Sequence, residues 1–463
     1  MRSNLTTLTA GTRLRSSDGL EHVLHRRIGA GGQGEVWLTE GKRRIVKVCY
    51  DSRHANEQRR QFAFVKSLPL EKLHVARPVG LLVPPMVGYV AEFLSEMVPM
   101  GTLLMPARGV PLPAWHRESG GLRRRLRLLA HAAEALSGLH EIGVSYGDLS
   151  DTNVMISADR AFSEAWLIDL DNVRHKTSLA DGVFTPHYAA PELERRTGST
   201  SSLTDAWSFA VLACWVLTLG HPFIGDRVDE DAELEAAALA AELPWVGDSD
   251  DPSNPTTRGL PIDMVLSAGL RGLAKKTFGR TGRATPAARA TVGEWATALH
   301  AAADRTITCQ ACDATFYDRS PICPWCDTAR PSHGRVEFYA WVPEPASTRA
   351  RGIDERHLRA ILSFDRRPDA TTTVSERQTH LTLGLAGRQP TLHLQATARG
   401  VQVTPADGSL VWLQDRAPSR NTAQSGFRHL PARGAHVGAG DQWLHFGPED
   451  QPHRVAVIKE VPR

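Results

Sequence analysis

Three polar residues in the middle of the chain have the types and spacing that phosphoryl transfer requires. Asp148 and Asn153 lie five residues apart in a polar segment, and Asp169 follows a short apolar run. Phosphoryl transfer needs a base for the attacking hydroxyl, oxygen ligands for Mg²⁺ and positive charge around the phosphates. Asp148 can serve as the base, and Asn153 and Asp169 can supply metal ligands. Each residue alone is more often a turn or cap residue, so the inference depends on the whole set.

A glycine-rich segment precedes these residues and is suited to phosphate binding. Gly29, Gly31 and Gly34 allow the backbone to approach an anion closely, with amide groups directed at it. A dinucleotide site of the Rossmann type would need a helix directly after the glycines. Alternation over 35–39 and 44–50 instead predicts two strands joined by a turn, which disfavours a dinucleotide site.

Lys47 is a charged residue within the apolar stretch 45–48. A buried ammonium group must meet a counter-charge or lose its proton. We expect Lys47 to face bound phosphates and to pair with Glu57, in a helix predicted over 56–67. Glu71 is the second candidate for this pairing, and a surface lysine on an edge strand is the simpler alternative.

In this order, the motifs resemble those of the eukaryotic-type protein kinase family, in a bacterial branch, over residues 21–304. The resemblance implies a bilobal fold that binds ATP and Mg²⁺ and phosphorylates proteins. It implies that Asp148 is the catalytic base and that Lys47 pairs with the α/β-phosphates and Glu57. The residues expected to contact ATP or Mg²⁺ are Gly29, Gly31, Gly34, Val36, Lys47, Glu92, Leu94, Asn153 and Asp169, the last two as Mg²⁺ ligands.

Further motifs agree with the resemblance. Ala190-Pro191-Glu192 matches the end of the family's activation segment, and Arg289 is expected to pair with Glu192. Asp205 matches the buried aspartate that steadies the catalytic loop. Thr185 matches the threonine that hydrogen-bonds the catalytic aspartate in serine/threonine kinases, which favours these over tyrosine kinases. The hinge for adenine is expected at 92–94, after a small Ala91.

Three departures from the family pattern keep other functions open. Gly147 replaces the arginine that receives a phosphorylated activation loop, Ser150 replaces a lysine near the γ-phosphate, and Asp171 replaces the glycine after the metal-binding aspartate. Lost positive charge at the transferring phosphate would slow catalysis. An ATP-binding pseudokinase scaffold is therefore the alternative. A small-molecule phosphotransferase fits less well, because the glycine loop and the 190–192 motif are complete.

Two Cys-x-x-Cys pairs, separated by ten residues, follow the kinase-like segment. Their thiolates are suited to surround a zinc ion tetrahedrally and to fold a module too small for its own core. Redox chemistry is the weaker alternative. The predicted ligands of this structural zinc ribbon are Cys309, Cys312, Cys323 and Cys326.

The remainder of the chain is rich in Val, Leu and Thr with glycine and proline turns, which predicts a β-sandwich. Alternation predicts strands at 380–383, 391–394 and 401–403. The stretch 437–447 resembles the closing strands of a forkhead-associated domain. A convincing set of phosphothreonine-reading residues is absent, so an interaction or regulatory β-domain is the default.

We therefore expect a multidomain α+β protein: leader 1–20, kinase domain 21–304 (lobes 21–94 and 95–304), zinc ribbon 305–332 and β-rich domain 333–463. Helices are also predicted over 122–139, 209–219 and 291–303.

The net charge of +3 gives no reason to expect nucleic acid or membrane as a partner. The chain has no apolar stretch typical of a signal peptide or membrane span, which predicts a cytoplasmic protein. Protein substrates are expected. The resemblance to kinases joined to zinc ribbons implies bacterial stress-response partners, a metal-dependent protein phosphatase and a von Willebrand A-type protein.

Overall fold

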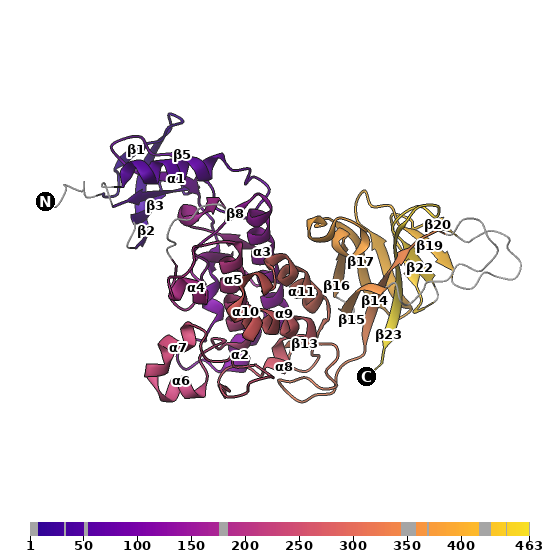
Figure 1. Cartoon of the computed structure of the whole chain (residues 1–463). Coiled ribbons are helices and arrows are strands. Elements are labelled where there is room, and N and C mark those ends of the chain that lie inside the picture. Colours follow the sequence, from indigo (N-terminus) through magenta and orange to yellow (C-terminus); the bar gives the residue numbers. More distant parts are fainter. Residues whose placement is uncertain are drawn as a thin grey trace, which may run out of the picture. The chain divides into compact units, whose positions relative to one another are not determined.

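The computed structural model describes residues 8–31, 34–50, 54–175, 184–343, 358–367, 370–415, 427–440 and 442–462 (Figure 1). The chain divides into two compact units, each with its own internal contacts. The first comprises Met1–Gly109, Leu128–Ile262 and Arg271–Trp295, and the second comprises Val110–Arg127, Asp263–Leu270 and Ala296–Arg463.

The first unit begins with an antiparallel six-stranded sheet in the order β1-β2-β3-β4-β6-β5. Its strands are β1 (Arg13–Arg15), β2 (Glu21–Ala30), β3 (Gly34–Thr39), β4 (Arg44–Cys49), β5 (Pro78–Leu81) and β6 (Gly88–Glu92). β3 and β4 form the predicted hairpin. β1 extends the sheet into the predicted leader, since Arg13 pairs with Val23. A three-residue strand with two arginines is too short and polar to show an alternating pattern.

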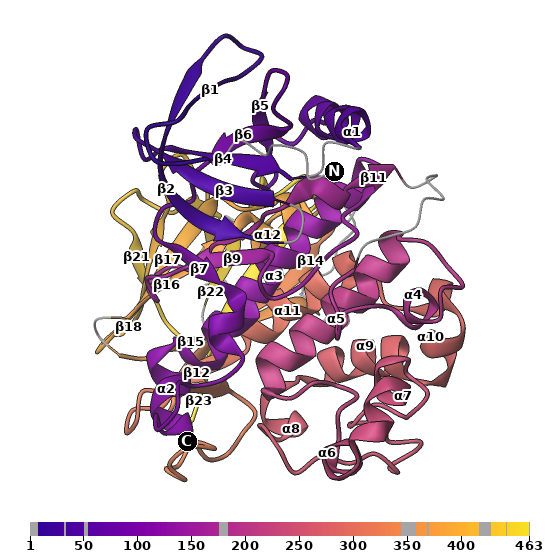
Figure 2. The ribbon, with the colours of Figure 1, turned by 90° about the vertical axis from the view of Figure 1, so that its left-hand side faces the viewer.

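Helix α1 (Ala55–Ser67) packs on this sheet against β5 and β6, as Figure 2 shows. It is amphipathic, and Phe62 and Val65 form its buried side. The Phe62 ring meets the Tyr89 ring of β6 edge to face, with 5.1 Å between centroids. This contact fixes one face of the helix that carries Glu57.

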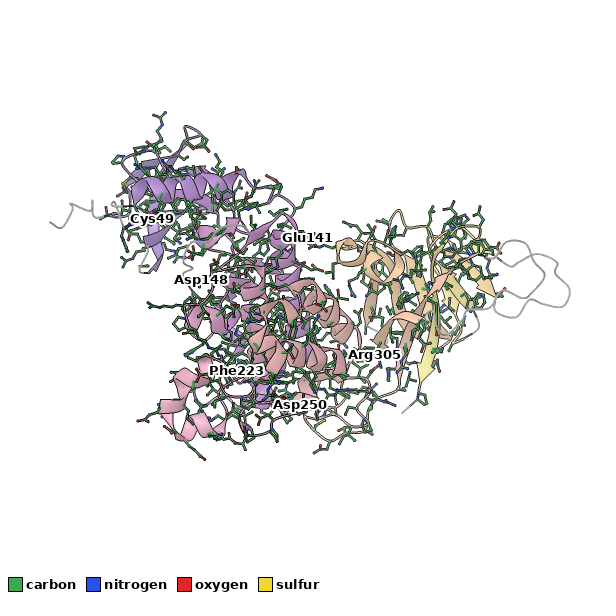
Figure 3. All side chains as sticks on the ribbon, viewed as in Figure 1. Cys49, Glu141, Asp148, Phe223, Asp250 and Arg305 are labelled. Atoms are coloured by element: carbon green, nitrogen blue, oxygen red, sulfur yellow. The ribbon has the colours of Figure 1, made fainter. Side chains whose placement is uncertain are left out.

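Helices make up most of the rest of the first unit and surround an aromatic core. Phe223, labelled in Figure 3, packs against Trp207 and Phe278, with ring centroids 5.3 Å from each, and those two rings also meet, with centroids 5.1 Å apart. The helical elements from residue 100 to residue 304 are η1 (Met100–Leu103), α2 (Leu112–Glu118), α3 (Gly121–Glu141), α4 (Pro191–Glu194), α5 (Ser202–Thr218), α6 (Asp226–Glu230), η3 (Ala232–Leu234), α7 (Glu235–Leu239), α8 (Ile262–Val265), α9 (Ala268–Phe278), α10 (Arg280–Ala284), η4 (Pro286–Ala288) and α11 (Val292–Asp304). The three helices predicted in this part of the chain correspond to α3, α5 and α11.

Short strands in the first unit hold the polar segment around Asp148. β7 (Met97–Pro99), β9 (Val154–Ser157) and β10 (Ala165–Leu167) form one small sheet. β8 (Val144–Ser145) pairs with β11 (Arg174–His175), and η2 (Leu170–Asn172) directly follows Asp169. The loop that carries Asp148 and Asn153 is thus fixed at both ends, by β8 and by β9.

The second unit contains the four-cysteine module. Its strands β12 (Thr306–Thr308) and β13 (Thr315–Tyr317) form a hairpin. The Trp325 ring stacks on His116 of α2, with centroids 4.6 Å apart. Arg123, near the start of α3, donates to the side chain of Thr306 at 2.8 Å. These contacts fasten the module to α2 and to the first turn of α3.

The rest of the second unit is a sandwich of two antiparallel sheets that share one core. One sheet has the order β15-β14-β23-β22-β19-β20, and the other has the order β16-β17-β18-β21. Core residues come from both sheets, including Phe338 and Leu444 of the first and Leu392 and Val403 of the second. The strands are β14 (His333–Trp341), β15 (Leu358–Asp365), β16 (Thr371–Ser375), β17 (Pro390–Thr397), β18 (Gly400–Pro405), β19 (Trp412–Asp415), β20 (Arg428–His429), β21 (Ala435–Val437), β22 (Gln442–His445) and β23 (His453–Val461).

One predicted strand of the sandwich is wrong. Residues 380–383 lie in a turn between α12 (Glu376–Thr379) and η6 (Gly384–Ala386). A capping box between Ser375 and Gln378 starts α12 and turns the chain away from an extended path. The strands predicted at 391–394 and 401–403 are present as parts of β17 and β18.

Across the described ranges, no helix combines the length and apolar character needed to cross a membrane.

Candidate active site

Lys47 lies on β4 with its side chain almost fully buried, and two aspartates surround it. Its Nζ atom is 2.5 Å from Asp169 Oδ1 and 2.7 Å from Asp171 Oδ2. Burial acts against the charged form of Lys47, but the carboxylates of Asp171 and Asp169 outweigh it and raise its pKa. Lys47 is therefore a firmly charged cation. Among the described residues, Glu57 makes no ion pair with it.

Asp205 of α5 holds the start of the Asp148 loop, as the resemblance implies. Its Oδ2 accepts the backbone N–H of Tyr146 at 2.7 Å, and its Oδ1 accepts that of Gly147 at 2.9 Å. The Nε2 atom of His140 lies 2.9 Å from the same carboxylate. Because Asp205 is buried, these bonds are strong constraints on the backbone just before Asp148.

Gly147 has a conformational reason to be glycine. Its φ angle is +89°, which side-chain-bearing residues rarely adopt, and a Cβ atom would lie 3.0 Å from the carbonyl oxygen of Asn172. The loss of the family's arginine at this position therefore accompanies a backbone conformation that suits glycine. The neighbouring Tyr146 is buried, and its hydroxyl donates to the carbonyl of Ile168.

Asp148 receives a hydrogen bond from the predicted threonine. Thr185 Oγ1 donates to Asp148 Oδ1 at 2.7 Å. Burial raises the pKa of Asp148 above its ordinary value, whereas the Thr185 hydroxyl opposes that shift. A half-buried carboxylate with a fixed orientation and a raised pKa suits a group that accepts a hydroxyl proton. Figure 3 labels Asp148 in the first unit.

Asn153 and Asp169 have free oxygen atoms suited to Mg²⁺. Asn153 Nδ2 donates to the backbone carbonyl of Asp148 at 2.9 Å, which leaves the carboxamide oxygen for a ligand. Asp169 has φ +56° and a side chain that is 35% exposed and lines a cavity. An amide oxygen and a partly solvated carboxylate are hard oxygen ligands, so the pair fits Mg²⁺.

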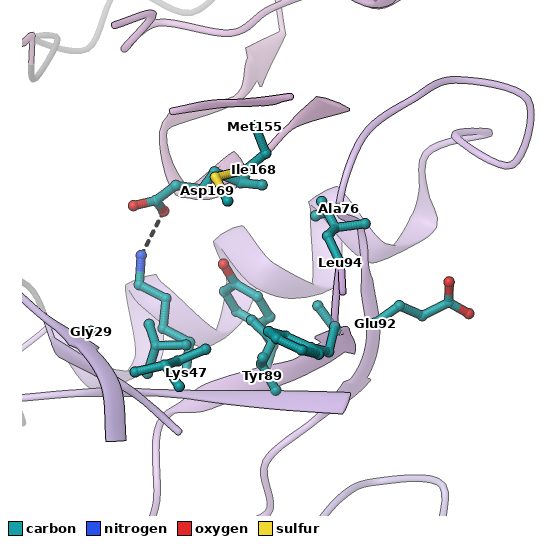
Figure 4. A pocket seen from close by; sticks show the side chains of 14 residues that line it. Gly29, Lys47, Ala76, Tyr89, Glu92, Leu94, Met155, Ile168 and Asp169 are labelled. Carbon is teal, nitrogen blue, oxygen red and sulfur yellow. Dashed lines mark hydrogen bonds and ion pairs between the residues drawn. The ribbon is translucent and has the colours of Figure 1, made fainter. Parts of the chain in front are cut away.

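A cavity of about 270 Å³ lies beside these residues, and apolar side chains dominate its walls (Figure 4). The Glu92 side chain points away from Lys47, so its backbone, and not its carboxylate, is suited to meet a base (Figure 4). A mostly apolar cavity with a lysine among its lining residues fits an adenine nucleotide. The cavity is lined by Ile28, Gly29, Val36, Ile45, Lys47, Ala76, Tyr89, Ala91, Glu92, Phe93, Leu94, Met155, Ile168 and Asp169.

The glycine-rich turn joins β2 to β3 at the edge of this cavity. At Gly34 a Cβ atom would lie 2.3 Å from the carbonyl oxygen of Val48, so only glycine allows this approach of the two strands. Gly31 N donates to Gly34 O at 2.9 Å and closes the turn. Gly29 lines the cavity, whereas positions 32 and 33 of the motif lie outside the described residues.

A buried ion pair joins the 190–192 motif to the helical core. The Arg289 guanidinium donates to both oxygens of Glu192 at 2.7 Å. It also lies over the Trp207 ring, 4.9 Å from the centroid. This pairing agrees with the expectation from the resemblance.

The four cysteines come together as the spacing predicts. Their sulfur atoms all lie within 4.8 Å of one another, and the Cys309–Cys326 and Cys312–Cys323 distances are 3.6 and 3.7 Å. A tetrahedron with Zn–S bonds of about 2.3 Å has sulfur atoms about 3.8 Å apart. None of the four is in a disulfide. The cluster can therefore hold a zinc ion.

Residues 107–292 match the family model of the protein kinase domain. The chain thus has a protein kinase domain fold together with a β-rich C-terminal region. The match covers the helical elements from α2 to η4 and the loop with Asp148, and it begins after the glycine-rich turn and Lys47.

Curated proteins similar to this chain include three bacterial serine/threonine-protein kinases. The chain is 28% identical to pkn2 of Myxococcus xanthus over 49% of its own length and 27% of that protein. It is 26% identical to PknE of Mycobacterium tuberculosis over 60% of its length and 45% of the relative. It is 34% identical to PknG of Mycolicibacterium smegmatis over 34% and 18%, respectively. The chain thus spans less than half the length of each.

The sequence analysis did not identify Asp171 and Tyr89 as site residues. Position 171 was considered only as the site of a lost glycine, but the Asp171 carboxylate contacts Lys47, and burial together with the Asp171 charge raises the pKa of Tyr89. A signal was available. Asp171 lies one residue after Leu170 and two before Val173, and a carboxylate so close to apolar side chains needs a partner if it is buried.

Proposed function

We propose that this chain is an ATP-dependent protein serine/threonine kinase of bacterial signalling. The hydrogen bond from Thr185 to Asp148 carries the proposal, because it orients a carboxylate that interacts electrostatically with Asp169 and Lys47, two residues that line the cavity. The kinase family match over the same segment supports it. Protein hydroxyl groups are accordingly the proposed acceptors.

Each residue has a proposed role in this reaction. Asp148 accepts the proton of the substrate hydroxyl, and Thr185 keeps its carboxylate aligned. Asn153 and Asp169 would hold Mg²⁺, which neutralises phosphate charge when bound. Lys47 would offset the charge of the α- and β-phosphates. The backbone of 92–94 would meet the adenine.

Incorporation of labelled phosphate tests the proposal. Purified protein is incubated with labelled ATP and Mg²⁺ and a generic protein substrate, beside Asp148→Asn and the control Asp159→Asn. Asp159 is an exposed turn residue whose oxygen accepts the N–H of Ala161 at 2.9 Å, a bond that asparagine retains. Asp148→Asn should lose transfer by about 10²–10⁴-fold, and Asp159→Asn should retain it. Label on serine or threonine supports the specificity.

The pseudokinase scaffold is the second candidate, and Ser150 is the observation that favours it. This residue replaces a lysine and is fully buried, with its hydroxyl 3.0 Å from that of Thr152. Nucleotide binding without phosphate transfer by the wild type would support the scaffold and contradict the kinase proposal.

We assign the remaining regions on the same basis. The domains are a kinase domain over 21–304, a zinc ribbon over 305–332 and a sandwich over 333–463 that is forkhead-associated-like. Four cysteines that are not in disulfides are usual in a reducing compartment, which supports a cytoplasmic location. A metal-dependent phosphatase and a von Willebrand A-type protein are the proposed partners, by family resemblance. Removal of the label by such a phosphatase, purified alone, tests the first.

A further inference from the structure

The Lys47 side chain is too buried for water to solvate its ammonium group. Its side chain is 8% exposed, and a desolvated ammonium group requires carboxylates close by. Only Asp169 and Asp171, among the residues that the structure describes, form ion pairs with it. The residue that sets the position of Lys47 is therefore either Asp169 or Asp171.

Asp169 and Asp171 differ in their surroundings. Asp169 is 35% exposed and lines the nucleotide-sized cavity, so its carboxylate is available to a metal ion. Asp171 is 10% exposed and does not line that cavity. Its flanking residues Leu170 and Asn172 are buried in the 3₁₀ turn η2, and its Oδ2 atom lies 2.7 Å from Lys47 Nζ. Asp171 is thus the fixed counter-ion, whereas Asp169 has a second task.

Glu57 lines a different cavity from the one that Lys47 lines. It lies in the first turn of α1 and lines a second cavity of about 680 Å³, together with Asp171. That cavity is polar and also contains Gln58, Arg60 and Arg174. The Glu57 carboxylate therefore has cations other than Lys47 in its surroundings. We expected the Glu57 carboxylate of α1 to pair with Lys47, but the carboxylate that does so belongs to Asp171, in the segment after Asp169.

We propose that Asp171 is the positioning residue for Lys47 and takes the place of a carboxylate from α1. The proposal rests on the proposed kinase function. In it, a bound metal ion would draw charge from Asp169, and Asp171 would then remain as the counter-ion that keeps Lys47 directed at the phosphates. The placement of Lys47 thereby depends on the loop that also carries Asp169, and not on the position of α1.

Kinetics of Asp171 variants test the positioning role. Asp171→Asn keeps the shape and removes the charge, and we expect kcat to fall by about 10- to 100-fold while the KM for ATP changes less than about threefold. A merely structural aspartate would lower the amount of folded protein and leave kcat per folded molecule unchanged. Asp171→Glu restores the charge and should recover part of kcat. Asp159→Asn is the matched control.

A double-mutant cycle in the nucleotide-free protein supplies a readout that does not depend on catalysis. Lys47→Met and Asp171→Asn should each lower Tm, and their combination should lower it by less than the sum, because the pair is lost only once. Lys47→Met combined with Glu57→Gln should be additive. Additivity of Lys47→Met and Asp171→Asn would overturn the proposal, as would a kcat of Asp171→Asn within about twofold of the wild type.

The two proposals can fail separately. If the wild type transfers no phosphate, the kinase function fails, but the unfolding cycle still decides whether Asp171 holds Lys47. If the wild type is active and the cycle shows no coupling with Asp171, only the positioning proposal fails.

Discussion

At the scale of single residues, Thr185 and Asp148 make the contact on which the proposed chemistry depends most directly. The threonine hydroxyl donates to the carboxylate at 2.7 Å, and this bond favours the ionised form of Asp148. Burial has the opposite effect and raises the pKa of Asp148. The protonation state of Asp148 therefore depends on two opposing effects: burial raises its pKa, and the Thr185 hydroxyl lowers it.

Replacement of Thr185 by valine should move the acid limb of the pH–rate profile. Without the hydroxyl the pKa of Asp148 rises, so the base is protonated at a higher pH and activity is lost sooner on acidification. Loss of the hydrogen bond should also lower kcat by roughly tenfold. Thr185→Ser retains a hydroxyl and should keep the wild-type profile. An unshifted acid limb in Thr185→Val would refute this role.

At the scale of elements, we expect the four-cysteine module, the proposed zinc ribbon, to depend on a metal ion for its fold. Its core is small and consists largely of the cysteines themselves with Ile307, Ala314 and Phe316. Burial of so few apolar side chains does not offset the entropy of ordering the chain. The hairpin β12–β13 should therefore require the metal to fold.

Loss of the metal should unfold the four-cysteine module. Cys323→Ser replaces a buried ligand, and we expect less than one zinc per chain together with a lower Tm for the second unit. The control is Cys214→Ser, a buried thiol on α5 outside the ribbon, which should keep the zinc. Zinc is quantified with a chromogenic chelator after denaturation. Full zinc content in Cys323→Ser would show that the four sulfur atoms do not act as one site.

A second element with a chemical dependence is the pair of strands β22 and β23, which carry two buried histidines. His445 Nδ1 lies 2.8 Å from His453 Nε2, and His453 Nδ1 lies 2.7 Å from the carbonyl of Gln451. Burial, with His453 adding to it, lowers the pKa of His445 to about 3, and burial lowers that of His453 as well. Both rings are therefore neutral in the folded chain near pH 7.

The sandwich should lose stability in acid. An unfolded histidine binds a proton below about pH 6.5, whereas His445 in the fold binds one only near pH 3, so the folded state is penalised as pH falls through this window. The cost for His445 is about 1.4 kcal/mol for each pH unit below 6.5. The second-unit Tm, measured between pH 8 and pH 5, should fall, and it should fall less in His445→Gln. Equal slopes would contradict this account.

At the scale of the whole molecule, buried carboxylates join the ribbon, the sandwich and the end of α11 within the second unit. Asp318 accepts two hydrogen bonds from Arg305, at 2.8 and 2.9 Å, and one from Ser363 at 2.6 Å. Asp304 accepts two from Arg377, at 3.0 and 3.1 Å. The ribbon is thus one part of a continuous structure with the sandwich.

Asp318→Ala should destabilise the ribbon and the sandwich together. Removal of the carboxylate leaves Arg305 without this partner and Ser363 without this acceptor, and because the Arg305 side chain is 33% exposed, we expect the free energy of unfolding of the second unit to fall by about 1–3 kcal/mol. Asp407→Ala, in an exposed turn, should change it by less than about 0.5 kcal/mol. Denaturant unfolding of the full chain measures both. An effect of Asp318→Ala as small as that of the control would show that the contacts carry little energy.

Sequence reasoning recovered the parts of this molecule that local pattern determines. The β3–β4 hairpin, α1 and the cysteine cluster follow from alternation, amphipathicity and ligand spacing. It did not recover the partner of Lys47, because Asp171 lies 124 positions later and only the three-dimensional fold brings them together. It also mispredicted 380–383, where a capping box at 375–378 overrides an alternating pattern. The periodicity of apolar residues gives no information about long-range charge pairs or side-chain caps.

Ala91 has a consequence for selective inhibition. It contributes only a methyl group to the wall of the nucleotide-sized cavity, directly before the 92–94 backbone. A larger side chain at this position would exclude a bulky aromatic substituent by steric overlap. An adenine-mimicking inhibitor with such a substituent directed at Ala91 should bind this chain, and Ala91→Phe should abolish its binding while ATP still binds. Such a compound would offer a pharmacological switch for this chain in the presence of other ATP-binding proteins.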